Sequence, residues 1–332
     1  MLKLSSRSET TQIPSPQPHS SDDRARCVQL LMAHPFFSLS KTPRLTPIDY
    51  ASGTATILVE ATGTLGIATI WDADILIWAA SQIMGGRERD GSGPSRLIET
   101  RPHEILTFLD WDHSKRSYER LRASLSRLNA TRVTTSFGPG SMGGLRHFHW
   151  IQEWRELKAE DGRSTRLKII LSEWIYDAIV TPGGCLTIDK DFFYLTGGLQ
   201  RWLYLLIRKH GGFQEDGWQF DLRYLYQKSG LLSRSVAFVA EIRRIVRRQS
   251  IPGYELSIVM SGAGKEVLRF KNLACGKAVD SNVLSRVKPH VLTRPKRTCY
   301  QWSQSNLSRC NQDVRGSRKI YSKIYSKSLL SG

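Results

Sequence analysis

A short helix, a turn, a longer basic helix and a β-hairpin are predicted in this order twice along the chain, and this repeat constrains the fold more than any other feature. In the first occurrence, the short helix covers residues 101–111 and the basic helix covers residues 114–129, where Ser114 is placed to cap it. Segments typical of β-strands follow at residues 131–137 and 144–154, joined by the glycine-rich loop GPGSMG. This order is that of a winged helix-turn-helix.

In the second occurrence, a helix over residues 201–211 ends at a glycine and is followed by a short helix over residues 220–230. The segment LLS then forms a turn, and a basic helix covers residues 233–249. A hairpin is expected over residues 254–270, with its turn at SGAG. We therefore predict an α+β protein with two tandem winged helix-turn-helix domains.

Composition sets the expected limits of these domains. The first winged-helix domain is expected at residues 31–165 and the second at residues 166–270. Residues 1–30 are rich in Ser, Pro, Thr and Gln, which predicts a disordered N-terminal segment. Residues 271–332 carry 13 Lys and Arg against two Asp, which predicts a basic, disordered tail.

The whole chain has 48 basic and 30 acidic side chains, a formal net charge of +18, which favours a polyanionic partner. Much of that excess belongs to the tail, so the net charge overstates how basic the folded surface is. No apolar run approaches the ~20 residues that span a bilayer, and the N-terminus lacks the apolar core of a secretory signal. Five cysteines without a CxxC pair fit a reducing compartment. We therefore expect a cytoplasmic protein without a membrane partner.

The helix over residues 233–249 is amphipathic. Phe238, Ile242 and Ile245 follow one apolar face, and arginines cover the opposite side. Such a helix suits a membrane surface, a partner protein or a DNA groove. A membrane helix gains nothing from a preceding helix and turn, whereas a recognition helix needs both, because the first helix supports the second in the major groove. We therefore expect this helix to read double-stranded DNA.

Several long segments resemble one family. The stretches GIATIWDADILIWAASQI, SYERLRASLSRLNATRVTT, FYLTGGLQRWLYLLIRKHGG and FDLRYLYQKSGLLSR are similar to the plasmid replication initiator protein A family of proteobacteria, and the similarity runs from about Phe36 to Phe270. The resemblance implies sequence-specific binding of double-stranded DNA at a plasmid origin in a bacterial cytoplasm. It also implies recruitment of the host replication initiator and the replicative helicase. Winged-helix initiators often dimerise through one domain, so a homodimer is an open expectation.

The candidate DNA contacts are the polar and basic side chains of the two recognition helices and of the segments beside them. In the first domain they are Lys115, Arg116, Glu119, Arg120, Arg122, Arg127 and Arg132. In the second domain they are Lys228, Ser233, Arg234, Ser235, Arg244, Arg247, Arg248 and Lys265. Residues at the start of each helix are expected at base edges, and the later arginines are expected nearer the phosphates.

An enzymatic alternative starts from His147 and His149, two histidines on one strand face, as in the metal site of HUH-type rolling-circle nicking enzymes. Tyr321 and Tyr325 have the spacing of a nucleophile pair, but they lie in a repetitive basic tail, and no acidic third metal ligand is apparent. We expect no enzymatic activity, no metal and no cofactor. A transcriptional repressor with the same fold is the other alternative, because it differs only in what the bound site does.

Two further motifs imitate other functions. The loop GPGSMGG contains a G-x-G-x-x-G pattern, but a β-segment rather than a helix follows it, so a wing tip is expected instead of a dinucleotide site. Asp72 with Asp74, and Asp110 with Asp112, resemble paired metal ligands. Each pair lies at a predicted helix boundary, where we expect the carboxylates to cap the helix or to oppose its dipole.

Overall fold

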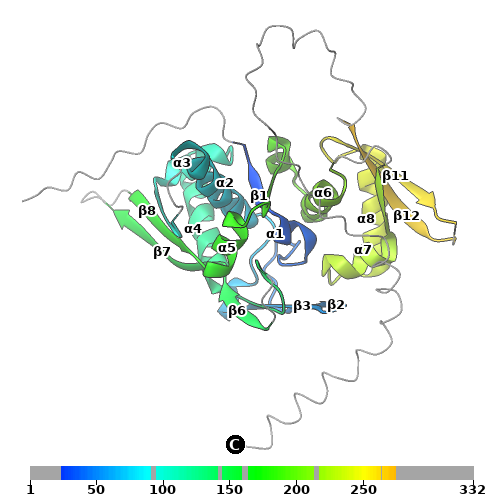
Figure 1. Cartoon of the computed structure of the whole chain (residues 1–332), viewed down its shortest axis with the longest axis horizontal. Helices are drawn as coiled ribbons and strands as arrows, with labels where there is room; N and C mark the ends of the chain where they lie inside the picture. Colours follow the sequence, from blue (N-terminus) through cyan, green and yellow to red (C-terminus); the bar gives the residue numbers. More distant parts are fainter. Residues whose placement is uncertain are drawn as a thin grey trace, which may run out of the picture.

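The computed structural model describes residues 24–90, 95–140, 144–158, 164–212, 217–262 and 264–273. It is a mixed helix and sheet structure (Figure 1). Helices α2 to α5 gather on one side of the molecule, while α7, α8 and the hairpin of β11 and β12 lie on the other. Within the described residues, no helix is both long enough and apolar enough to cross a membrane.

The first of two similarly built units follows the predicted order, with an additional strand before its second helix. We call it the first unit, and it consists of α2 (Ala73–Asp90), β4 (Leu97–Thr100), α3 (Pro102–Phe108), α4 (Lys115–Ala130), β7 (Ile151–Lys158) and β8 (Ser164–Leu171). Pro102 occupies the first turn of α3, and the Ser114 hydroxyl accepts a hydrogen bond from Ser117 N at the start of α4, as expected. Its strands form an antiparallel sheet in the order β4-β8-β7.

The second unit repeats this arrangement. It consists of α6 (Gly198–His210), β10 (Trp218–Asp221), α7 (Leu222–Ser229), α8 (Ser235–Arg248), β11 (Tyr254–Met260) and β12 (Glu266–Asn272). Gly230 ends α7 with φ 62°, a left-handed conformation that glycine adopts without strain. The sheet order β10-β12-β11 is the same as β4-β8-β7 in the first unit. The two units therefore share both the order of their elements and the pairing of their strands.

The expected wing of the first domain was assigned to the wrong hairpin. Strands β5 (Thr131–Thr135) and β6 (Arg146–His149) do pair with each other, but they continue a sheet of order β2-β3-β5-β6, whose other strands are β2 (Ile48–Ser52) and β3 (Ala55–Ala61). The hairpin equivalent to β11 and β12 is formed by β7 and β8. The sequence HFHWIQEW looks like one strand, yet buried Trp150 lies between β6 and β7 and packs on Phe148 and Trp174, so the chain passes there from one sheet to the other.

Order begins earlier in the chain than expected. Residues 24–30 were assigned to a disordered segment, but β1 (Arg26–Val28) pairs with β9 (Cys185–Thr187), and α1 (Gln29–Ala33) follows it directly. Cys27 and Val28 are buried because β1 packs against α2. The expected boundary between residues 165 and 166 falls inside β8, which pairs with β4 and β7. The division of the chain into two domains therefore stays a prediction, and residues 1–23 and 274–332 lie outside the described part.

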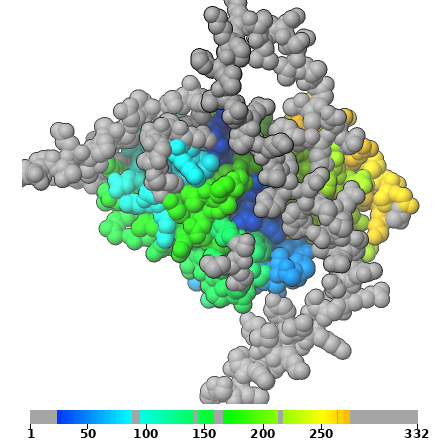
Figure 2. Space-filling view, viewed as in Figure 1, coloured from blue at the N-terminus to red at the C-terminus, as the bar shows by residue number. Residues whose placement is uncertain are grey.

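The remaining elements fill the space between the units. They are the short 3-10 helices η1 (Gly63–Leu65) and η2 (Lys190–Tyr194) and the helix α5 (Glu173–Val180). Helix α1 packs against α6, and one continuous apolar core runs through both units. In the space-filling view the yellow hairpin of β11 and β12 stands at one edge of the molecule, away from the cyan and green surface of the first unit (Figure 2).

Candidate nucleic-acid interface

Helix α8 presents one face to the core and the other to solvent. Phe238, Ile242 and Ile245 are buried, which matches the apolar face predicted from the sequence. The helix ends at Gln249, whose φ is 46°. The Gln249 side chain donates to Leu256 O at 2.8 Å and accepts from Leu256 N at 2.9 Å, so the end of α8 is fixed to β11. The exposed face of α8 is thereby held at a constant angle to the hairpin.

The start of α8 is a mixed polar and apolar surface. Ser233, Arg234 and Ser235 are exposed there, as predicted. Two apolar side chains flank them: Leu232 is 64% exposed, and Val236 is 78% exposed, the largest fraction among the exposed large apolar residues of the described part. Sequence periodicity had not selected either residue as a candidate contact, because it marks apolar side chains as core. Their place beside the basic helix start is the signal that could have identified them.

The later turns of α8 carry a row of arginines. Arg247 and Arg248 are exposed, as expected. Arg244 donates to Glu241 of the same helix at 2.8 Å, which raises the pKa of Arg244 through a hydrogen bond to a carboxylate. Arg243 had not been predicted as a contact, and it donates to both oxygens of Glu266 on β12, at 2.8 and 3.0 Å.

A shallow groove of about 490 Å³ runs between α8 and β11. It is lined by Ala240, Arg243, Val246, Arg247 and Ile258. The lining thus combines three apolar side chains with two arginines, which suits a ligand with both apolar and anionic parts.

The first turns of α4 form a similar basic surface. Lys115, Arg116, Glu119 and Arg120 are exposed, as predicted, and the Lys115 ammonium lies 3.9 Å from Glu119. The Arg120 guanidinium lies 3.6 Å from the centre of the Trp111 ring, which holds that side chain in place.

The two aspartates before α4 have different roles. Asp112 does not cap α4 itself, because Ser114 is the N-cap; instead it accepts from Ser114 N and Ser117 Oγ, and these bonds lower the pKa of Asp112 to about 2. Asp110 does not cap a helix. Its carboxylate accepts from the Tyr194 hydroxyl at 2.7 Å.

Three of the predicted DNA contacts of the first domain are instead bonded to carboxylates within the fold. Arg122 donates to Glu156 on β7, with its shortest contact at 2.8 Å. Arg132 donates to Glu60 at 2.7 Å across the β3–β5 pair, on the four-stranded sheet rather than beside α4.

Arg127 makes a two-point contact with the buried Asp72 and is three-quarters covered. The alternation of arginines along α4 could not distinguish these residues from Arg116 or Arg120, because their partners are distant in sequence.

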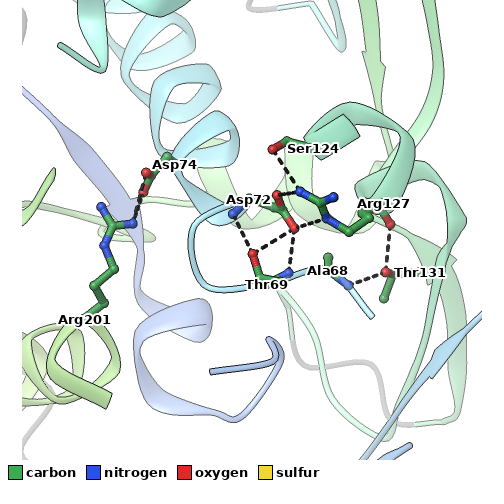
Figure 3. A network of polar contacts seen from close by, with 8 residues as sticks. All are labelled: Ala68, Thr69, Asp72, Asp74, Ser124, Arg127, Thr131 and Arg201. Carbon is green, nitrogen blue, oxygen red and sulfur yellow. Dashed lines mark hydrogen bonds and ion pairs between the residues drawn. The ribbon is translucent and has the colours of Figure 1, made fainter. Parts of the chain in front are cut away.

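One more predicted DNA contact, Lys228, is buried. It is 6% exposed, and its ammonium lies 5.6 Å from the Tyr50 ring centre and 5.5 Å from that of Tyr224. Asp74 lies in the first turn of α2, as expected for a carboxylate that opposes the helix dipole, and it also forms an ion pair with Arg201 of α6 (Figure 3). In contrast, Lys265 lies exposed in the turn between β11 and β12, where the hairpin places it near the end of the second unit.

The histidines of β6 were weighed as metal ligands. His147 lies 2.9 Å from the Thr134 hydroxyl, and the Nδ1 atom of His149 is buried without a hydrogen-bond partner. Among the described residues, no group of three or more His, Cys, Asp or Glu side chains is arranged to hold a metal ion. Tyr321 and Tyr325 lie outside the described residues.

Comparisons with known proteins agree on one family. The profile of the family described as replication initiator protein A matches residues 28–256. A putative replication protein of Wigglesworthia glossinidia brevipalpis is 32% identical over 228 residues, which cover 68% of this chain and 82% of that protein.

The fold is also found in solved structures. A crystal structure of selenomethionine derivatives of domains 2 and 3 of RctB matches with a TM-score of 0.54 at 14% identity, over 74% of this chain and 98% of that one. A second crystal structure of RctB domains 2 and 3 gives a TM-score of 0.46. The first of these two structures shows a shared mixed helix and sheet fold. The family profile over residues 28–256 and the relative that is 32% identical lead to one conclusion: the chain belongs to the replication initiator protein A family.

Proposed function

We propose that the chain is a sequence-specific double-stranded DNA-binding protein that initiates plasmid replication by binding repeats at an origin in the bacterial cytoplasm. Each unit is a winged helix-turn-helix in this proposal. Helices α4 and α8 enter the major groove, and the hairpins of β7 with β8 and of β11 with β12 are the wings. The observation that carries the proposal is the exposed face of α8, with Arg234 at its start and Arg247 and Arg248 in its last turn, presented beside a hairpin that is fixed to the same helix.

The arrangement of elements supports this reading. A winged helix-turn-helix places a supporting helix before the recognition helix and a hairpin after it. Both units have that order. In the first unit β4 pairs with β8, and in the second unit β10 pairs with β12. A helix of ~10–12 Å diameter fits the ~12 Å wide major groove of B-form DNA. The start of such a helix reaches base edges, and here that position holds Arg234 between two serines.

The charges of α8 support a division of contacts. Arg247, Arg248 and Lys265 are exposed and suit phosphates, which set affinity and register. Arg243 and Arg244 are bonded to Glu266 and Glu241 at the surface, where solvent and salt screen the attraction within each ion pair. Each of these arginines can therefore leave its carboxylate and bind a DNA phosphate with little loss of free energy. One sugar–phosphate strand of the DNA then lies along the groove between α8 and β11, in contact with Arg243 and Arg247.

The proposed activity is non-enzymatic and needs no metal or cofactor. Bound copies bend the origin DNA and gather the host replication initiator and the replicative helicase; family membership is the basis for these two partners. The chain binds as a monomer or as a homodimer, and the stoichiometry of the complex with origin DNA distinguishes them.

A nuclease-protection footprint on DNA flanking this gene, with competitor DNA and near-physiological salt, tests the proposal. Protection of regularly spaced direct repeats is the expected result. A single protected palindrome over a promoter would support a transcriptional repressor instead. Protection no better than that of random DNA would contradict sequence-specific binding.

A further inference from the structure

Two carboxylates at the start of α2 bind two different helices from positions two residues apart. Asp72 accepts from Arg127 Nε at 2.8 Å and from Arg127 Nη2 at 2.7 Å. Asp74 accepts from Arg201 Nη1, at 2.9 Å to Oδ1 and 3.0 Å to Oδ2. The two carboxylates point to opposite sides (Figure 3). Because Arg127 belongs to α4 and Arg201 to α6, this short stretch at the start of α2 is bonded to the recognition helix of the first unit and to the first helix of the second unit.

The Asp74–Arg201 pair is fully enclosed, with both side chains 1% exposed. Arg201 Nε donates to Leu195 O at 2.9 Å, and Nη2 lies 3.4 Å from Phe192 O and 3.3 Å from Phe193 O. The guanidinium also lies 4.6 Å from the centre of the Phe192 ring. Burying two charges is costly, and the fold recovers that cost only through good geometry and a full set of hydrogen bonds. All three guanidinium nitrogens have an acceptor here.

The contact between Asp72 and α4 is fixed by a second set of hydrogen bonds (Figure 3). Thr69 donates to Asp72 Oδ2 from its amide at 2.7 Å and from its hydroxyl at 3.0 Å. The Thr131 hydroxyl accepts from Ala68 N and donates to Arg127 O, both at 2.8 Å. The end of α4 is therefore attached to the segment before α2 through both its side chains and its backbone.

The other contacts near the joint between the units include close backbone packing and several hydrogen bonds to backbone carbonyls, among them those of Arg208 to Thr187 O and of Lys209 to Gln29 O. Gly198, at the start of α6, lies so close to Leu39 that an added Cβ would be 2.0 Å from Leu39 O. Arg44 donates to Gly230 O at the end of α7. Apolar packing between α1 and α6 holds the units together but has no preferred direction, whereas a two-point charged contact fixes an orientation. The Asp74–Arg201 pair is the buried, two-point ion pair that joins α2 of the first unit directly to α6 of the second.

We propose that Asp74 and Arg201 are positioning residues that set the distance and the helical phase between α4 and α8. They thereby determine the spacing of the two DNA elements that one chain reads. The inference about the spacing of DNA elements rests on the proposed function, whereas the inference about the distance between α4 and α8 does not depend on DNA. A buried pair that specifies one arrangement among several is the best attested role of such groups.

The first test measures the arrangement directly in the full-length chain. Spin labels are attached through ketone-bearing unnatural residues at Ala123 of α4 and Ala240 of α8, which are both exposed, so that the cysteines stay unchanged. Wild type is expected to give one narrow distance distribution. The double variant Asp74→Leu/Arg201→Met replaces the pair by apolar side chains of similar volume, a change that folds generally tolerate. It is expected to give a broader or shifted distribution.

A matched control removes an ion pair within a single unit. Glu99 of β4 and Lys168 of β8 are bonded at 2.7 Å, so Glu99→Leu/Lys168→Met removes a charged contact without touching the joint. This control is expected to keep the wild-type distribution. If Asp74→Leu/Arg201→Met does not fold, Asp74→Asn/Arg201→Gln takes its place, because it removes both charges together and keeps hydrogen-bonding groups at both positions. A variant of Asp74 and Arg201 that folds and keeps the narrow wild-type distribution would overturn the proposal.

The second test measures DNA spacing. A duplex selected from a random-sequence pool by the wild-type chain is altered by inserting about 5 base pairs, half a helical turn, between its two protected elements. Wild type is expected to lose affinity about tenfold or more, as for a mismatched base pair. The Asp74→Leu/Arg201→Met chain is expected to lose less than about threefold while binding each isolated element as wild type does.

An equal loss in both proteins would overturn the inference about DNA spacing. If wild type selects no sequence at all, the proposed function fails, and the distance measurement alone then decides the role of the pair in the joint.

Discussion

The arginines of α8 differ in what their guanidinium groups contact, and the difference decides what each substitution should do. Arg234 stands at the helix start without a capping bond from its side chain, where base edges are met. Arg248 lies in the last turn, nearer the expected phosphates. Arg234→Ala should reduce the preference for origin DNA over random DNA by about 1–3 kcal/mol.

Arg248→Ala should weaken both complexes by a similar factor and reduce the salt dependence by about one released ion. Competition titrations at several salt concentrations measure both effects. Equal behaviour of the two variants would contradict this division of contacts.

Val236 leads to a second prediction at this scale. A valine that is 78% exposed in the first turn of a basic helix is placed to meet the methyl group of a thymine, the apolar feature of the major groove. Replacing the critical thymine by uracil removes only that methyl group and should lower the affinity of wild type about threefold to tenfold. The Val236→Ala chain should bind the two duplexes nearly equally. Titration of single thymine-to-uracil duplexes provides the measurement, and the Val259→Ala chain, altered in the hairpin, should keep the wild-type dependence.

At the scale of elements, the sequence predicts helices and hairpins well but assigns contacts poorly. The bounds of α7 and α8 follow from Gly230 and from the apolar face of α8, both local signals that need no partner. The hairpin of β7 and β8 was missed because Trp150 separates two sheets without interrupting the run of β-forming residues. The partners of Arg122 and Arg127 lie far along the chain, so periodicity cannot show that they are bonded. Only the tertiary structure therefore shows which of the candidate DNA contacts are exposed and free of carboxylate partners.

The end of α7 offers an element-scale prediction. Gly230 and Gly253 both have positive φ, 62° and 75°. A Cβ at Gly230 would lie 3.1 Å from Ile48 Cγ2 and 3.2 Å from Pro35 Cβ, whereas one at Gly253 would meet nothing. Gly253→Ala should lower the free energy of unfolding by ~1 kcal/mol through backbone strain alone. Gly230→Ala should lower it by ~2 kcal/mol or more, because strain and crowding add. Urea titrations measure both, and equal losses would show that the contact with Pro35 and Ile48 adjusts freely.

At the scale of the whole molecule, the joint between the units buries several basic groups together. Burial lowers the pKa of His34 to about 3, with further lowering from Lys228, Lys209 and His210. Burial also lowers the pKa of His210 to about 3, helped by Lys209 and Lys228, and it lowers the pKa of Lys209 to about 8. His34 precedes the first unit in the chain, while the other groups belong to the second. Charging the histidines would therefore place repelling cations across the joint.

This arrangement predicts acid sensitivity with a definite sign. Between pH 6.5 and 3 the unfolded chain binds protons at His34 and His210 that the folded chain does not, so the free energy of unfolding decreases as the pH falls. The stability contributed by neutral histidines is fully present above pH ~6.5 and is lost toward pH 3. Asp74 acts in the opposite direction, because burial raises its pKa to about 6 and the folded chain then takes up that proton first. Wild type should lose about 2 kcal/mol between pH 7 and 5.5.

Variants separate the histidines from Asp74. His34 lies against Phe137, and His210 lies against Phe220, so phenylalanine fits both sites as an aromatic of similar shape. The His34→Phe/His210→Phe chain should not lose stability over the same interval and should instead become slightly more stable, because the raised pKa of Asp74 remains. His113→Phe, an exposed histidine near Thr107, is the matched control and should follow wild type. Denaturant unfolding at each pH measures the difference. If the double variant lost stability as steeply as wild type, the acid-sensitive groups would lie elsewhere in the chain. Protonation of His34 and His210 would then not be what lowers the free energy of unfolding.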